Sequence, residues 1–389
     1  MSIIRRIIGG SETRTVGGNW FADNNVQSSA GVQINQQNAT SIGAVWSSIQ
    51  LYSSTIAAMP WGVYIRDRGV RRPVTRPLWL DNPVPNNPNY TGFDFKHKIT
   101  SSLLTDGNAF VFFLTNDMGD VVEARVLDPQ KVKITADPDG TPHYHVTTND
   151  GTIVVGAEQM VHIPLFAPGE TLRSLSPIDH HRVTMGLAQA TQEYSALWYQ
   201  NGAVPSGVIK INGELTSDQA EMLRQDFSRR HSGLKNMHRV SVLTGGADYV
   251  QASVKLSDMQ LVETMHWGVE AIARIYGVPL QLLQYPGGNT SYASSETLGQ
   301  AWLTLGLAPM VARIEAGLQR MIVGQTTFIK FNFDSLLRPT TAERMAVYVE
   351  AVNNGIYSLN EVRALEDKEP IGPEGDVFRQ PLNIGKVGQ

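Results

Sequence analysis

The chain has 389 residues, of which 42% are hydrophobic and 17% charged, and its formal net charge is -4. This length predicts two or three domains with cores of their own. The negative balance excludes a surface that is basic all over, so any contact with nucleic acid has to be local. Without cysteine there is no disulfide, no thiolate nucleophile and no Cys-ligated zinc or iron-sulfur cluster.

The first forty residues predict a polar arm. Residues 1–10 hold only two isoleucine pairs around Arg5 and Arg6, which is too little for a signal peptide, and residues 11–40 are rich in Gly, Ser, Asn and Gln. We expect this arm, residues 1–40, to lie along a neighbouring subunit or partner. No later run reaches the roughly 18 apolar residues that a membrane span needs, so we expect a soluble protein made in the cytoplasm.

Residues 41–176 predict a mixed α+β domain. Apolar residues at helical spacing run from Ile42 to Ile56, and Pro60 ends this helix before a strand at residues 61–67. A second amphipathic helix lies near residues 93–103. Six short strands then follow between residues 108 and 164, separated by Gly, Asp, Asn and Pro turns.

The middle of the chain predicts two long helices around a small insertion. The first helix occupies residues 177–201 and the second residues 257–277, which Gly277 and Pro279 end. Between them we expect a strand at residues 207–211, a helix that Thr216 and Gln219 open as a capping box, and a strand at residues 239–243. The insertion, residues 202–256, is therefore α/β.

The last third predicts a loop, a bent helix, a strand and two short helices. The loop at residues 284–294 carries Gly287 and Gly288, and Pro309 should kink the helix at residues 294–321. The strand at residues 327–334 alternates apolar and polar side chains. Two capping boxes, Thr340 with Glu343 and Ser358 with Glu361, open the final helices. The fold class is α+β.

Catalytic signatures are absent. The sequence has no GxxxxGK[ST] or GxGxxG loop, no GxSxG elbow and no HExxH helix. The triplet Asp179, His180 and His181 matches the DHH motif of a manganese phosphoesterase family, which is the enzyme alternative. It stands just after Pro177 at a predicted helix start, where Asp179 is favoured by the helix dipole, so a structural role is the preferred interpretation.

Other chemical groups have structural explanations. His143 and His145 share one face of a predicted strand and could hold a metal, and His162 lies on a later strand, but a part-exposed strand face is the commoner outcome. Asp137 and Asp139 belong to the turn sequence DPDG. We therefore expect no catalytic, cofactor or metal site.

Two charge patterns leave alternatives open. One positive stretch, in the insertion, is a patch that contacts DNA or a protein partner, or else a solvated helix face; it comprises Arg229, Arg230, Lys235 and Arg239. Residues 257–312 carry one arginine and four carboxylates: Asp258, Glu263, Glu270, Arg274 and Glu296. A surface with this charge would let duplex DNA slide past without strong ion pairing. The alternative is that the low charge simply reflects a pair of core helices.

Taken in order, several strings resemble the phage portal protein family, in the form carried by long-tailed siphophages with compact portals. They are IAAMPWGVYIRD, GNAFVFF, LDPQKVKI, MVHIPLF, LRSLSPID, YQNGAVPSGVIK, IARIYGVPLQLLQ, LAPMVARIEAGLQRMI and FNFDSLLRPTTAERMAVYVEAVNNGIYSLNEVRAL, followed by a Pro/Gly tail. The match runs from about residue 41 to residue 383. The arm before residue 40 matches no family motif.

The resemblance implies a dodecameric ring of subunits with four regions. By position, residues 41–176 and 278–338 correspond to the wing, 177–201 and 257–277 to the stem helices, 202–256 to the clip, and 339–389 to the crown and tail. A tunnel loop would project toward the DNA; it comprises Gln284, Tyr285, Gly287, Gly288, Asn289, Thr290, Ser291 and Tyr292.

The resemblance also implies a function that involves no catalysis by this chain. The ring would stand at one capsid vertex of the virion and conduct double-stranded DNA during packaging and ejection. Its partners would be the terminase large subunit, a head-tail adaptor, and the major capsid protein or scaffold. The alternatives are the metal phosphoesterase and a capsid or tail ring that does not conduct DNA.

Overall fold

The computed structural model describes most of the chain between residues 31 and 379. The described residues are 31–168, 171–200, 207–210, 216–219, 221–222, 225, 248–251, 257–285, 292–322, 324, 326–333, 336 and 341–379. Contacts within the chain divide it into two units. Unit 1 is Met1–Ala58 with Gly62–Lys330, and unit 2 is Met59–Trp61 with Phe331–Gln389.

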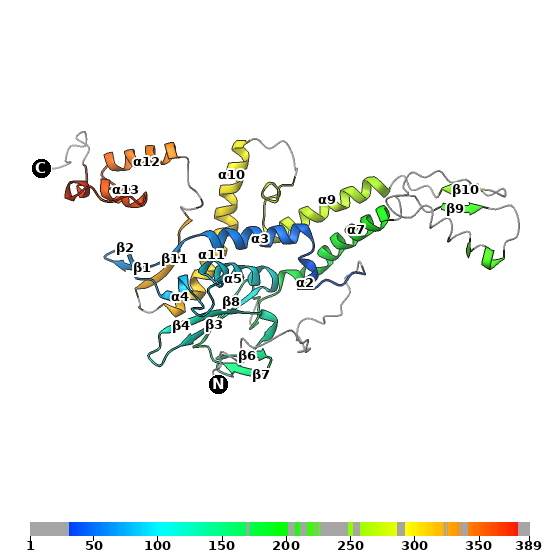
Figure 1. The fold of residues 1–389 in the computed structure, drawn as a ribbon, viewed down its shortest axis with the longest axis horizontal. Coiled ribbons are helices and arrows are strands. Elements are labelled where there is room, and N and C mark those ends of the chain that lie inside the picture. Colours follow the sequence, from blue (N-terminus) through cyan, green and yellow to red (C-terminus); the bar gives the residue numbers. More distant parts are fainter. Residues whose placement is uncertain are drawn as a thin grey trace. The chain divides into compact units, whose positions relative to one another are not determined.

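Two helices of unit 1 pack side by side, α3 (Gly43–Ala58) and α5 (Gly92–Asp106) (Figure 1). Each has an apolar stripe at helical spacing, which buries Ile56 on α3 and Ile99 on α5. Both helices were predicted and are confirmed. The short helices α2 (Gln36–Ala39) and α4 (Leu78–Asp81) were not predicted.

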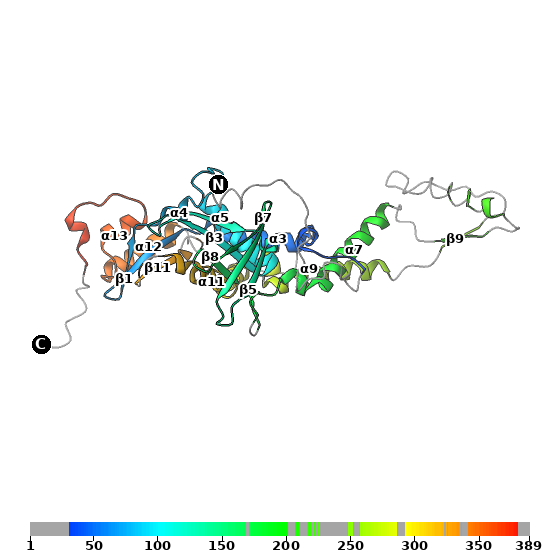
Figure 2. The same ribbon diagram turned by 90° about the horizontal axis from the view of Figure 1, so that it is seen from below.

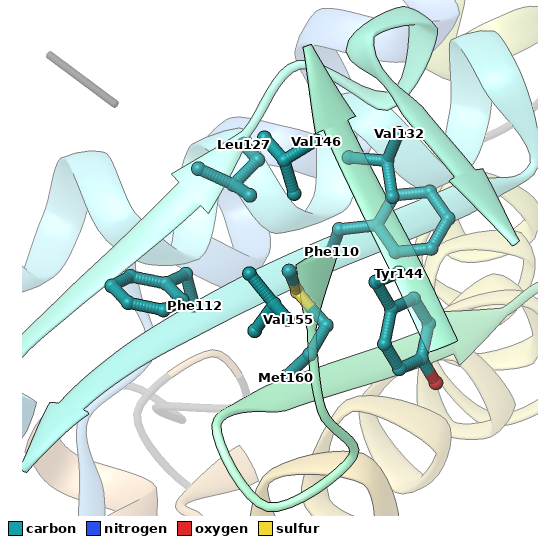
Figure 3. Close-up of a cluster of buried hydrophobic side chains, with 8 residues drawn as sticks. All are labelled: Phe110, Phe112, Leu127, Val132, Tyr144, Val146, Val155 and Met160. Carbon is teal, nitrogen blue, oxygen red and sulfur yellow. The ribbon is translucent and has the colours of Figure 1, made fainter. Parts of the chain in front are cut away.

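Six strands form two antiparallel sheets that share one core. The first sheet has the order β4-β3-β8, and the second has the order β5-β6-β7. Eight side chains from both sheets meet in the cluster of Figure 3: Phe110, Phe112, Leu127, Val132, Tyr144, Val146, Val155 and Met160. The bounds are β3 (Asn108–Thr115), β4 (Val121–Leu127), β5 (Val132–Ala136), β6 (Pro142–Thr148), β7 (Gly151–Val155) and β8 (Met160–Pro164).

A third sheet has the order β11-β1-β2. Its strands are β1 (Trp61–Asp67), β2 (Val70–Val74) and β11 (Thr327–Phe331), and β1 has the predicted bounds. Val63 and Ile329 are buried on one face of this sheet. Strand β2 was not predicted because its sequence, VRRPV, lacks an alternating apolar pattern.

Helices α6 (Pro177–His180), α7 (Arg182–Gln200) and α9 (Ser257–Tyr276) confirm the two predicted long helical segments. Between them, β9 (Gly207–Lys210) pairs with β10 (Asp248–Gln251) in antiparallel register. The predicted strand at residues 239–243 lies outside the described residues. The capping box of the insertion is confirmed, because Gln219 N donates to Thr216 Oγ1 at 3.4 Å and Thr216 N donates to Gln219 Oε1 at 3.1 Å.

The helix predicted at residues 294–321 is interrupted, but not by a simple proline kink. It consists of α10 (Tyr292–Trp302), a π-helical turn (Leu303–Leu307), α11 (Ala308–Leu318) and a final 3-10 turn (Gln319–Met321). In an α-helix the ring of Pro309 would clash with the carbonyl four residues earlier. The wider π-turn directly before the proline relieves that clash.

Unit 2 contains α12 (Thr341–Asn353), α13 (Leu359–Leu365) and a 3-10 turn (Pro373–Asp376). The predicted capping box of Ser358 and Glu361 is confirmed, whereas Thr340 lies outside the described residues. Arg344 binds both carboxylate oxygens of Glu366, at 2.6 and 3.2 Å, and so ties α12 to the end of α13. Among the helices that the structure describes, none is long and apolar enough to cross a bilayer.

Candidate functional site

Helices α7 and α9 lie side by side in both views of the ribbon (Figures 1 and 2). A β-carbon built on Gly268 of α9 would stand 3.3 Å from the β-carbon of Ala188 on α7, so small residues permit the close approach. Further along the pair, Ser195 Oγ donates to Met265 Sδ at 3.6 Å. Among the described side chains of the pair, Met185 near the start of α7 and Ile272 near the end of α9 are fully buried.

Large apolar side chains are exposed along the same two helices. On α9, Ile272 is buried whereas Met265 is 38% exposed. The exposed set is Val183, Leu187, Tyr194 and Leu197 on α7, with Val262, Met265 and Trp267 on α9. Apolar side chains gathered in this way mark an interaction surface more often than those scattered singly.

Among the described side chains of α9, few exposed ones are charged. Glu263 and Glu270 are exposed and acidic on α9, and Arg274 is exposed near its end. The side chains of Asp258 and Glu296, the other members of the predicted acidic set, lie outside the described residues. The exposed face of α9 is therefore weakly acidic and largely apolar.

The loop that follows α9 is described only at its ends. A 3-10 turn (Leu280–Leu283) leads to Gln284, which has a positive φ of 55°. The ring of Tyr285 packs edge-on against His266 of α9, with 5.4 Å between ring centroids. Tyr292 begins α10. The other predicted loop residues, Gly287, Gly288, Asn289, Thr290 and Ser291, lie outside the described residues.

One phenol joins three elements around this loop. Tyr52 of α3 donates a hydrogen bond to the carbonyl oxygen of Tyr276, at the end of α9, at 3.1 Å. Its ring meets Trp302 edge-on, with 5.0 Å between centroids. Burial raises the pKa of Tyr52, so the hydroxyl stays a neutral donor. The ends of α9 and of α10 are thus both anchored to α3.

The DHH triplet has a structural role in this fold. Ser176 caps α6 by accepting a hydrogen bond from Asp179 N at 3.1 Å, and burial raises the pKa of Asp179. The rings of His180 and His181 pack edge-on at 5.1 Å. No group of three His, Cys, Asp or Glu side chains that could hold a metal occurs within the part of the chain that the structure describes. The phosphoesterase alternative has no support here.

The remaining candidate ligands have other partners. His143 contacts Asp137 at 2.8 Å and His145 contacts Thr135 at 2.8 Å. Asp139 accepts a hydrogen bond from Thr141 N at 2.9 Å, which is the turn chemistry predicted from DPDG.

A buried polar network around Asp106 was not predicted. Arg173 donates to Asp106 Oδ1 at 2.7 Å, to the carbonyl of Val132 at 2.7 Å and to that of Pro129 at 3.0 Å. Asn108 donates to the same Asp106 oxygen at 2.8 Å. Because Arg173 and Asp106 are 67 residues apart, no local spacing pattern could have indicated their contact.

The predicted clip patch cannot be placed. Arg229, Arg230, Lys235 and Arg239 all lie outside the described residues. A second basic cluster, at the β1–β2 hairpin, was not predicted from the sequence.

Comparison with known proteins finds a matching family and a similar phage protein. The family model for phage portal proteins matches residues 43–367. A probable portal protein of Streptomyces phage phiC31 is 33% identical over 377 residues, which covers 92% of this chain and 82% of the relative.

Solved structures share the fold. An HK97-family phage portal protein from Corynebacterium diphtheriae has a TM-score of 0.60 at 19% identity, covering 79% of this chain and 98% of that one. A chain from the neck of a native gene transfer agent particle, computed with C12 symmetry, has a TM-score of 0.59 at 23% identity, covering 86% of this chain and 94% of that one. The family match spans well over half of the sequence, and this chain belongs to the phage portal protein family.

Proposed function

We propose that this chain is the subunit of a ring-shaped portal at one capsid vertex of a virion, through which double-stranded DNA is packaged and ejected. The family match over residues 43–367 is the observation that carries this proposal. The ring itself performs no catalysis, and nucleotide hydrolysis belongs to a separate motor.

A ring requires a surface for a second copy. The exposed apolar side chains of α7 and α9 supply a candidate surface, since burying apolar area is the main driving force for subunit association. The C12 symmetry of the related neck structure supports twelve copies.

The regions of the subunit follow by position. We assign the wing to residues 41–176 and 278–338, the stem to residues 177–201 and 257–277, the clip to residues 202–256, and the crown and tail to residues 339–389. The anchoring of the chain where the loop begins, at Tyr276 and Tyr285, supports a tunnel loop between Gln284 and Tyr292, because such a loop has to be held at its base.

The partners of such a ring follow from its position. During packaging it would dock the terminase large subunit, and later a head-tail adaptor would replace the motor at the clip. The basic residues Arg229, Arg230, Lys235 and Arg239 are the candidate contacts there. The major capsid protein or a scaffold would surround the wing.

Negative-stain microscopy of the purified full chain tests this proposal. We expect rings with a central channel wide enough for a DNA duplex. Monomers at all concentrations, or rings whose lumen is narrower than a duplex, would contradict it. The second result would favour a capsid or tail ring that does not conduct DNA.

A further inference from the structure

The hairpin of β1 and β2 carries an unusual concentration of positive charge. Five exposed arginines stand within eleven residues of a chain whose net charge is -4: Arg66, Arg68, Arg71, Arg72 and Arg76. Aspartates neutralise two of them. Arg72 lies 3.4 Å from Asp67, and Arg76 lies 3.1 Å from Asp81.

The other three arginines are held by aromatic rings or by backbone geometry, not by carboxylates. Among the described residues, Arg66, Arg68 and Arg71 form no ion pair. The guanidinium of Arg71 lies 4.3 Å from the ring centroid of Tyr64, and that of Arg66 lies 5.8 Å from the ring of Phe328. Stacking on a ring orients a guanidinium and leaves its edge donors available.

These arginines stand where local structure disfavours them. Arg68 and Gly69 form the two-residue turn, with φ angles of 48° and 83°. The first position of such a turn favours Asn, Asp or Gly, because a larger side chain strains the left-handed conformation. Arg66 and Arg71 are directly opposite each other in the register, which places like charges side by side. The strained turn residue and the facing like charges both indicate that these arginines bind a ligand.

A shallow open hollow lies beside the hairpin. Arg66 and Gly69 line it from the hairpin, Thr326, Thr327 and Phe328 line it from the β11 side, and Gln319 completes it. Gln319 is already committed, since its side chain bonds the carbonyl of Thr327 at 2.7 Å and the amide of Ile329 at 3.1 Å. Among the described residues that line the hollow, Arg66 is the charged one.

We propose that Arg66, Arg68 and Arg71 bind the phosphate backbone of duplex DNA. A polyanion placed between Arg66 and Arg71 would remove their mutual repulsion, and a guanidinium matches two phosphate oxygens at once. Such contacts recognise the charge of the phosphates and not the base sequence. That the bound duplex is packaged genome rests on the proposed function; the binding itself does not.

The test measures binding of a fluorescent duplex of mixed sequence to the full-length protein by anisotropy, from 50 to 300 mM salt. The test variant combines Arg66→Gln, Arg68→Gln and Arg71→Gln. The matched control combines Arg72→Gln and Arg76→Gln, which removes arginines that already have carboxylate partners. The test variant should bind at least about tenfold more weakly at the lowest salt, and its slope of log K against log salt should fall by about 2 to 3. The control should keep most of the slope.

Folding failure is not expected to confuse this result. Removing the like-charge pair should offset the loss of the two ring contacts, so the melting temperature of the test variant should stay close to that of the unchanged protein. Undetectable DNA binding by the unchanged protein overturns the proposal, and so does equal binding by the test variant. If the test variant binds DNA normally but is lost from particles, the hairpin binds a protein, which also overturns it.

The same variants separate this inference from the portal function. If the test variant still forms rings and supports packaging with unchanged DNA affinity, the hairpin inference fails and the portal proposal stands. If the unchanged protein forms no rings yet binds DNA through these arginines, the portal proposal fails and the hairpin inference stands.

Discussion

Arg173 makes three hydrogen bonds that join segments far apart in the sequence. It contacts the carboxylate of Asp106 at the end of α5 and the carbonyls of Pro129 and Val132, at the start of the second sheet. Only 7% of the Asp106 side chain is exposed, so its charge depends on partners within the protein. The arginine is a structural cross-link between α5 and the sheets.

Replacing Arg173 with Met should lower the free energy of unfolding by about 3 kcal/mol, because the buried carboxylate loses its cation. Chemical denaturation of the full chain measures this. The matched control is Arg313→Met, which removes one hydrogen bond to the carbonyl of Pro164 and should cost about 1 kcal/mol or less. Equal losses in the two variants would contradict the role of Arg173.

His162 should make stability depend on pH. Burial, and then the nearby charge of Arg173, lower its pKa from 6.5 to about 4. Since the unfolded imidazole titrates near 6.5, the unfolded state binds more protons between these two values. The contribution of His162 is complete above pH 6.5, falls as the pH is lowered, and is lost near pH 4.

We therefore expect unfolding at pH 5 to require less denaturant than at pH 7, with a full effect of about 3 kcal/mol across the window. In His162→Gln this dependence should flatten, because glutamine can still donate to Asn108 Oδ1 but does not titrate. An unchanged pH profile in the variant would assign the dependence to other groups.

At the scale of elements, the π-turn before Pro309 is held by close packing. A β-carbon on Gly306 would stand 2.8 Å from Tyr52 Oη and 2.9 Å from Trp302 Cδ1. Tyr52 and Trp302 cannot both retreat, because Tyr52 is bonded to the carbonyl of Tyr276. The glycine is therefore required by its neighbours, and not by its own φ angle.

Gly306→Ala should destabilise the fold by about 1 to 3 kcal/mol, as overpacking of a close-packed site does. Gly299→Ala on α10 is the matched control, since nothing lies within 4 Å of the β-carbon it would add. The control should stabilise by about 0.5 to 1 kcal/mol through helix propensity. Thermal unfolding of the two variants should shift in opposite directions; shifts of the same sign would count against this packing argument.

At the scale of the whole molecule, assembly should depend on the open apolar face of α9. Val262 and Trp267 are 51% and 45% exposed in the single chain. A charge placed there would have to be buried without a partner in any ring that uses this face. Surface substitutions on a monomer, by contrast, usually change stability little.

The double variant Val262→Glu with Trp267→Glu should therefore keep the melting temperature of the monomer but lose rings, as judged by mass photometry and negative stain. Glu263→Gln, an exposed neighbour, is the control and should still assemble. Rings that form normally from the double variant would move the subunit interface to another surface.

Local sequence signals determined most of the secondary structure. Residues within a few positions of one another were enough to predict three features that the structure confirms. These are the amphipathic helix before Pro60, the strand at residues 61–67 and the capping box at Ser358. Short sequence motifs spread over most of the chain determined the family, because their order along the sequence does not depend on any single contact in the fold.

Tertiary structure decided what local signals could not carry. The bond between Arg173 and Asp106 joins residues far apart in sequence, and Tyr52 reaches Tyr276 across an even longer separation. Strand β2 exists because β1 offers it hydrogen bonds, and that pairing places Arg66 directly opposite Arg71. The sequence by itself determined the elements and the family, while only folding determined which charges and polar groups meet, because such contacts depend on positions in space that no local pattern records.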